Sequence, residues 1–357
     1  TLNINQLKIG DKIMLNKKLI ATSALVAAAS ISAPAISDVS VSGYQEWNYI
    51  DRGSESDGGL GVLTGLTFKG GGELDNGIGY SVSFTVEDNG ADAISSFNAA
   101  GRAITFSLGE GLSLGIGYDQ SYGIETVKAI SPYVNNRRAD ILGAHRGLLT
   151  ATNKPHGPDV WDTSSGENAI GLGYKNDMVS LSLGFTPKRD QVRSTDSSGT
   201  ASDQGSATSF GIKINAVEGL TIAGGATSEN SDTVTNSDPK GSTIGFSYKL
   251  GNFAIGYQEI ENDIDAADST PDSTEIEEGG IAYKVNDALT IGVYGASIAY
   301  IQDSANDNGV ETDLAIVQIG YNLGPAVVQY DYVEGNHLNG DVTDTEDTHK
   351  LKVKVNF

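Results

Sequence analysis

The amino-acid sequence predicts an all-β fold, a transmembrane barrel of sixteen antiparallel strands. After residue 37, short runs alternate apolar and polar side chains with a period of two, the pattern of a strand with two different faces. Tight turns and long polar connections alternate along the chain. No segment beyond residue 37 is apolar enough for a membrane helix, so a closed barrel is the remaining way to span a bilayer.

The alternation is clearest at 77–87, where every even position is apolar and every odd one is Gly, Ser, Thr or Glu. The same pattern recurs at 112–119, 178–185 and 243–250. It predicts strands near 38–50, 59–69, 77–87, 101–109, 111–121, 167–175, 178–186, 206–215, 219–228, 241–250, 252–260, 275–285, 288–301, 311–322, 325–334 and 346–357.

Seven of the predicted connections are tight and contain the Gly, Asn and Asp residues that hairpin turns require. They lie at 74–77, 109–111, 176–177, 217–219, 251–252, 286–287 and 324–325. The other eight are long and polar. Short turns at one rim and long loops at the other are typical of a bacterial outer-membrane barrel with both termini in the periplasm.

The two faces of the predicted strands differ in a way that favours a membrane barrel. The bulky apolar face continues from strand to strand, whereas the opposite face is rich in Gly, Ser and Thr. In the alternative, a soluble β-sandwich or adhesin repeat, the second face would also have to pack a core. We therefore expect the apolar face to contact lipid and the small polar face to line water.

The N-terminal residues predict export. Residues 14–37 begin with Met14, contain Lys17 and Lys18 before an apolar run, and end with small residues, as a secretory signal peptide does. A membrane anchor is the alternative, but the apolar run is shorter than the roughly 20 residues that span a bilayer. Residues 1–13 are interpreted as an upstream segment outside the fold, and 38–357 as the barrel.

The composition excludes other classes of protein. The formal net charge is -23, with no basic tract, which argues against nucleic acid as a partner. Absence of Cys excludes thiolate chemistry and disulfide scaffolds. The four His residues lie in or beside predicted loops, and no HExxH, GxSxG or P-loop motif is present, so we expect no enzyme. A barrel hydrolase remains a rival hypothesis.

One connection is much longer than the others. Residues 123–166 show no alternation and contain Pro132, Pro155 and Pro158. Five Lys/Arg residues balance four Asp/Glu residues there, so this loop is about neutral in an acidic chain. An unstructured loop of this length is commonly functional.

The final strand alternates and ends in Phe357. With the signal peptide, the sixteen-strand pattern and the long third external loop, residues 38–357 resemble the Gram-negative general porins, especially the compact trimeric porins of alphaproteobacteria. The resemblance implies an outer-membrane homotrimer that lets small hydrophilic solutes and ions diffuse, surrounded by lipid and lipopolysaccharide. It also implies that Phe357 is an assembly signal and that 123–166 folds into the lumen. The rival is a surface adhesin or structural barrel with a plugged lumen.

Relatives commonly carry an acidic third loop, whereas this loop carries arginines, so the family's charge selectivity does not transfer to this chain. The residues expected to form the pore constriction come from the loop and from inward positions of the wall: Arg137, Arg138, Asp140, His145, Arg146, Glu46, Glu87, Asp119 and Asp331.

Lysines follow aromatic or apolar residues near the predicted periplasmic ends of several strands. Inward-facing lysines there would give the lumen an axial field, positive at the periplasmic mouth and negative outside; the alternative is that they only solvate strand ends. They are Lys69, Lys175, Lys213, Lys249, Lys284, Lys352 and Lys354.

No cofactor is expected. The external segments 259–278 and 341–347 are acidic and offer the oxygen ligands that Ca²⁺ or Mg²⁺ use, although no EF-hand spacing is present. Solvated, mutually repelling loops are the first interpretation, and loosely bound divalent cations that bridge to lipopolysaccharide are the second.

Overall fold

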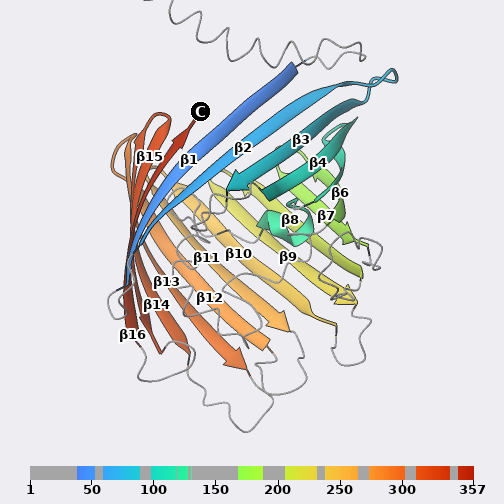
Figure 1. Ribbon diagram of the computed structural model, residues 1–357. Coiled ribbons are helices and arrows are strands. Elements are labelled where there is room, and N and C mark those ends of the chain that lie inside the picture. Colours follow the sequence, from blue (N-terminus) through green and yellow to red (C-terminus); the bar gives the residue numbers. More distant parts are fainter. Residues whose placement is uncertain are drawn as a thin grey trace, which may run out of the picture.

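The computed structural model of the chain describes residues 38–52, 59–88, 98–118, 120–127, 130, 168–187, 206–230, 238–263, 273–301, 311–337 and 345–357. In these residues, sixteen antiparallel strands form a closed barrel in which each strand pairs with its sequence neighbours and β1 pairs with β16 (Figure 1). The predicted fold class is confirmed. The predicted signal peptide, 14–37, and the segment before it lie outside the described residues.

The elements follow one another in chain order round the ring. They are β1 (Asp38–Arg52), β2 (Gly59–Glu73), β3 (Gly79–Asp88), β4 (Asn98–Gly109), β5 (Leu112–Tyr118), the 3₁₀ helix η1 (Gly123–Val127), β6 (Asn168–Lys175), β7 (Val179–Thr186), β8 (Ser206–Val217), β9 (Leu220–Asn230), β10 (Lys240–Leu250), β11 (Phe253–Asp263), β12 (Ser273–Lys284), β13 (Leu289–Ile301), β14 (Thr312–Leu323), β15 (Ala326–Asn336) and β16 (Thr345–Asn356).

The barrel closes where its two ends meet. β1 and β16 pair in register from Tyr44 opposite Asn356 to Arg52 opposite Thr348. Beyond the last strand, the backbones of Gly43 and Phe357 exchange two hydrogen bonds of 2.8 and 2.9 Å. Phe357 therefore extends the pairing that leaves the barrel without an open sheet edge.

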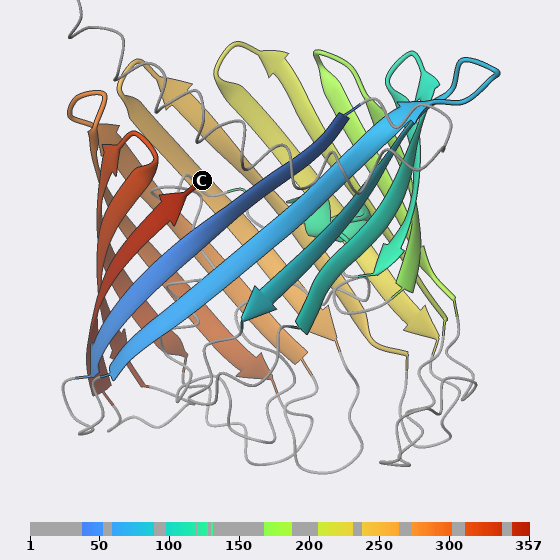
Figure 2. The same cartoon turned by 45° about the horizontal axis from the view of Figure 1, so that its top comes forward.

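The seven tight turns are confirmed and lie at one rim of the barrel, together with the C-terminus (Figure 2). Asparagine side chains organise two of them. Asn176 Oδ1 accepts hydrogen bonds from the backbone of Met178 and Val179, and Asn286 Oδ1 accepts them from Ala288 and Leu289. Asn is favoured in turns because its side chain can satisfy backbone donors in this way.

Large apolar side chains cover the outer wall. Trp47, Phe84, Ile116, Leu183 and Phe246 are all exposed, and each stands on the parity that the alternation predicted to face outward. Aromatic residues also pair there, as Phe253 and Tyr283 do near the rim of tight turns, with ring centroids 4.6 Å apart. Such a surface is stable in contact with lipid tails, not with water.

The expectation of a small, polar lumenal face holds only in part for β11–β15. Ile260, Ile276, Ile298, Leu314 and Ile316 are buried on the inner face. Near the rim of long connections, the outward positions of β11 and β12 are acidic instead, so the polarity of the two faces is reversed there. The physical reason is the position along the barrel axis. Outward side chains beyond the lipid-covered band contact water, so polar residues are stable there.

This reversal of polarity explains why the predicted acidic loop between β11 and β12 is shorter than expected. The segment 259–278 was expected to be an acidic loop, but β11 extends to Asp263 and β12 begins at Ser273. Glu261 pairs directly opposite Glu275 across these two strands. A rule that required apolar outward residues ended the first strand too early and began the second too late.

Several other strands differ from their predicted bounds by a few residues, and for two of them, β2 and β5, the structure gives a reason. β2 runs four residues further than expected because the Gly70–Gly72 stretch stays paired, with Gly71 opposite Ser81. β5 ends at Tyr118, three residues earlier than expected, because the chain then turns into the barrel. In the described part of the chain, no helix is long and apolar enough to cross a membrane.

Candidate functional site

The chain that follows β5 enters the barrel. Gly123 N donates a 2.8 Å hydrogen bond to Ser182 Oγ on β7, and Ile130 N donates one of 2.8 Å to Gln258 Oε1 on β11. Gln258 is fully buried and also donates to Thr243 Oγ1 on β10. The described start of the long loop is therefore bound to the inner wall, in agreement with the prediction that this loop folds inward.

Glycines on the inner wall make room for the start of the long loop. A Cβ at Gly211 on β8 would collide with the carbonyl oxygen of Gly123 and come within 2.7 Å of Thr126 Oγ1. A Cβ at Gly171 on β6 would collide with the ring of Tyr122. Part of the Gly-rich lumenal face thus exists because another segment of the chain approaches its backbone closely.

Apolar contacts hold the same segment. Ile124 and Val127 are completely buried, and with Ile130 they belong to a lumenal cluster that also contains Ala223 and Ile260. Complete burial of such a side chain contributes about 1.5–3 kcal/mol. The anchoring of the loop is therefore mainly hydrophobic, with the hydrogen bonds setting its position.

The anchor and the barrel seam lie half a turn apart. η1 contacts β7, β8, β9 and β10, and β16 and β1 are eight strands away from β8 and β9 in the closed ring. Figure 1 shows η1 as the short teal coil inside the ring of strands. The wall that faces the anchored loop across the lumen is accordingly the seam.

Charged side chains converge on the lumenal side of this seam. Glu46 on β1 is 95% buried, and its carboxylate lies 3.2 Å from Lys352 Nζ and 3.8 Å from Lys354 Nζ, both on β16. Asn48 Nδ2 donates a 3.0 Å hydrogen bond to the same carboxylate. These partners compensate part of the cost of removing the charges from bulk water.

The network continues across β2. Tyr44 OH donates a 2.8 Å hydrogen bond to Glu87 Oε1 on β3, and Lys354 Nζ lies 3.7 Å from the centre of the Tyr44 ring. The ring can cross β2 because Gly65 has no side chain there; a Cβ would collide with it. We call Tyr44, Glu46, Glu87, Lys352 and Lys354 the seam wall.

A second buried carboxylate lies beside the seam wall. Asp331 on β15 is completely buried, and its Oδ1 accepts hydrogen bonds from Gln318 (3.0 Å) and Gln329 (2.8 Å). Lys350 is opposite Asp331 in the register of β15 and β16. Sequence reasoning missed Gln318, Gln329 and Gln258. Their positions in the alternating pattern, on the side that faces the lumen, could have identified them.

Of the predicted constriction residues, Glu46, Glu87 and Asp331 project inward as expected. Arg137, Arg138, Asp140, His145, Arg146 and Asp119 lie outside the described residues.

The predicted mouth lysines fall into two groups. Those near the tight turns fit the expected height: Lys175 and Lys284 end their strands, and Lys69, Lys213 and Lys249 lie close to the ends of theirs. Lys352 and Lys354, however, sit beside Glu46 instead of being separated from it along the axis. At the seam the two signs of charge are therefore mixed at one level, and the expected axial separation does not hold there.

One of the lysines near the tight turns forms an exposed ion pair. Lys284 Nζ donates a 2.8 Å hydrogen bond to Asp287 Oδ1 in the turn after β12. This hydrogen bond and the charge of the ammonium lower the pKa of the Asp287 carboxyl from its ordinary value. Lys284 thus has a carboxylate partner, as Lys352 and Lys354 do, but its pair is exposed to solvent.

In the described ranges, no group of three or more His, Asp or Glu residues is placed to hold a metal ion. The acidic residues on the outward face of β11 and β12 lie opposite one another in pairs and do not enclose a common point.

A closed barrel with a lipid-compatible outer wall, a charged lumen and a loop whose start is bound to the inner wall defines an outer-membrane channel protein. The family model of the Gram-negative porins matches residues 21–341, and the chain belongs to this family. It is an outer-membrane porin.

Solved structures agree with this fold. Two engineered variants of the porin of Rhodopseudomonas blastica match with a TM-score of 0.61 and 15% sequence identity, covering 90% of this chain and 100% of theirs. A third variant of that porin matches with a TM-score of 0.60 and 14% identity, over the same shares of the two chains. At such identities the likeness shows the fold alone. No curated protein matches by sequence comparison.

Proposed function

We propose that this porin lets small hydrophilic solutes and ions diffuse passively across the outer membrane. The observation that carries the proposal is the opposition of two lumenal structures: the loop start anchored on β7–β11 and the charged seam wall half a barrel away. A solute in the lumen would pass between them. Fixed charges on a wall of low dielectric constant act strongly on solutes within a few ångströms.

Solute entry into liposomes tests this function. Purified protein is reconstituted, and the swelling rate is measured with neutral sugars of increasing size. We expect swelling that slows as the sugar grows, because a water-filled constriction excludes by size. A barrel with a plugged lumen would give the swelling rate of protein-free liposomes for every sugar.

The constriction residues of the long loop form a separate part of the proposal. Arg137, Arg138, Asp140, His145 and Arg146 would oppose the inward carboxylates of the wall and create a transverse field. The loop charges would then influence selectivity more than the exposed acids of the outer rim, which salt screens within about 10 Å at 0.1 M. Cation preference would be weaker than the net charge of the chain suggests.

Replacing the three arginines Arg137, Arg138 and Arg146 with Ser tests the role of the loop. The reversal potential in a KCl gradient is expected to shift towards cation selectivity. An unchanged reversal potential, together with an unchanged conductance, would place these residues outside the pore.

We infer a homotrimer as the working assembly, following the resemblance to trimeric porins. Multi-angle light scattering on the detergent-solubilised protein, corrected for bound detergent, measures the mass directly. A mass of one subunit would exclude the trimer.

A further inference from the structure

A pocket of about 590 Å³ lies at the lumenal side of the rim of tight turns, between β8 and β11. Ile130, the last described residue of the inward loop segment, forms part of its lining. The pocket is therefore on the periplasmic side of the loop anchor. A solute that crossed the lumen would pass this pocket.

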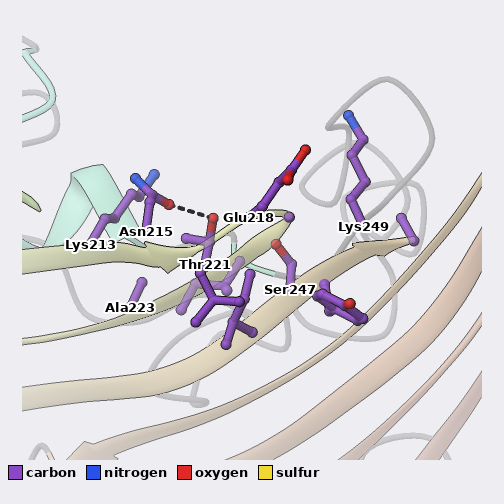
Figure 3. A pocket seen from close by; sticks show the side chains of 13 residues that line it. Lys213, Asn215, Glu218, Thr221, Ala223, Ser247 and Lys249 are labelled. Carbon is purple, nitrogen blue, oxygen red and sulfur yellow. Dashed lines mark hydrogen bonds between the residues drawn. The ribbon is translucent and has the colours of Figure 1, made fainter. Parts of the chain in front are cut away.

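Two lysines line the pocket from β8 and β10, the strands on either side of β9. Lys213 extends from β8 and Lys249 from β10, and the turn residue Glu218 stands at the rim between them (Figure 3). In the described part of the chain, neither lysine has a carboxylate within ion-pair distance. Lys284 and Lys352, in contrast, have Asp287 and Glu46 as partners. Lys175 is close enough to Lys213 to add to the positive potential.

Neutral hydrogen-bonding groups complete the polar side of the pocket. Thr221 Oγ1 donates a 2.6 Å hydrogen bond to Asn215 Oδ1, which fixes the amide and leaves its Nδ2 group to donate elsewhere. Ser247 contributes a hydroxyl from β10. Ammonium, amide and hydroxyl donors that line one pocket favour a ligand with several acceptor oxygens.

The remaining lining is apolar. Ala223 and Ala254 supply small side chains and Ile130 a larger one. A volume of this size lies within the usual range of small-molecule pockets. The pocket thus fits a compact molecule with anionic oxygens and a short carbon skeleton.

We propose that this pocket is a low-affinity subsite for small organic anions, carboxylates or phosphate esters, on the periplasmic side of the loop anchor. The inference rests on the proposed diffusion function, because solutes reach the pocket through the lumen. A weak site here would raise the local concentration of anions at the exit of the pore. Glu218 opposes the bound charge and keeps the affinity low enough for release.

The test uses citrate and inorganic phosphate as probes with the detergent-solubilised protein. Isothermal titration at 0.1 M salt compares the wild type with the double variant Lys213→Gln/Lys249→Gln. We expect citrate affinity to fall at least about tenfold in the double variant, since two positive charges that line the pocket are lost. Lys284→Gln, which removes a mouth lysine already paired with Asp287, is the matched control and should leave the affinity unchanged.

Two further measurements define the subsite. Glu218→Gln should tighten citrate binding about threefold or more, because a like charge is removed from the rim. Binding of citrate but not phosphate would assign the pocket to carboxylates, and the reverse result to phosphates. Equal citrate affinity in the wild type and the double variant, or equal losses in the double variant and the control, would overturn the proposal.

Planar bilayers separate this inference from the diffusion function. With citrate on the periplasmic side, wild-type channels should show current noise that the double variant lacks. Channels that conduct without lysine-dependent noise, in a protein without lysine-dependent binding, overturn the subsite and leave the porin function intact. A protein that binds citrate through the lysines but does not conduct overturns the diffusion function alone.

Discussion

Glu46 on β1 and Lys352 on β16 form a buried ion pair, 3.2 Å long, across the junction that closes the barrel. Both side chains are almost inaccessible to solvent, 7% and 2% exposed. The pair therefore belongs to the closure of the fold, on the lumenal side of the wall.

The first prediction concerns this pair. Glu46→Gln keeps the size of the side chain but removes the charge that balances Lys352, and such a change typically costs about 3–5 kcal/mol at a buried pair. We expect a lower urea midpoint for unfolding from lipid vesicles and a shift of the reversal potential towards anions. Asp287→Asn, which breaks the exposed Lys284–Asp287 pair, is the control and should leave the urea midpoint almost unchanged, because water and salt screen an exposed pair. Equal losses in the two variants would contradict the role of burial.

The second prediction tests the fit between the loop and the wall. Gly211→Ala places a methyl group against the backbone of Gly123, so the loop start or β8 must move. We expect a stability loss of about 1–3 kcal/mol, typical of overpacking, and a changed single-channel conductance. The control is Gly61→Ala on β2, also inward-facing, where the nearest atom to the added Cβ is 4.0 Å away. A conductance unchanged by Gly211→Ala would mean that the anchored loop start does not shape the pore.

The third prediction concerns the outward acids. Glu261 and Glu275 are opposite one another on β11 and β12, and like charges in that arrangement destabilise a sheet by about 0.2–1 kcal/mol. Glu275→Gln should raise the unfolding midpoint at low ionic strength, and the gain should shrink at 1 M salt as screening increases. A gain that does not depend on salt would point to a non-electrostatic cause.

The alternation predicted the strands well because each strand of the barrel lies between two different media, lipid and the lumen. It failed where one medium changes along the same strand. At Glu259 and Glu261 the outside is water, so acids replace apolar residues, and Ile260 turns inward to the apolar cluster. Hydropathy along the chain contains no direct measure of height above the membrane, so this change could not be located beforehand.

The alternation had a similar limit for the lumenal residues of the candidate site. Parity placed Glu46, Glu87 and Asp331 in the lumen, since the direction of a strand side chain follows from position alone. Parity could not show that Lys352 and Lys354 meet Glu46, because that contact depends on the stagger between β1 and β16. Sequence reasoning also could not show where the start of the loop binds. That place depends on glycines from several strands, which form one surface only when those strands are paired.

The central claim is that the lumen conducts between the anchored loop and the seam wall. Single-channel recording in planar bilayers at 1 M KCl measures this directly. We predict stepwise, long-lived openings with ohmic conductance of porin size, and a smaller conductance when neutral polymers small enough to enter the lumen are added. A protein that inserts without producing current steps would contradict the account and favour a plugged structural barrel, and hydrolysis of lipid or peptide by that silent protein would favour an enzyme.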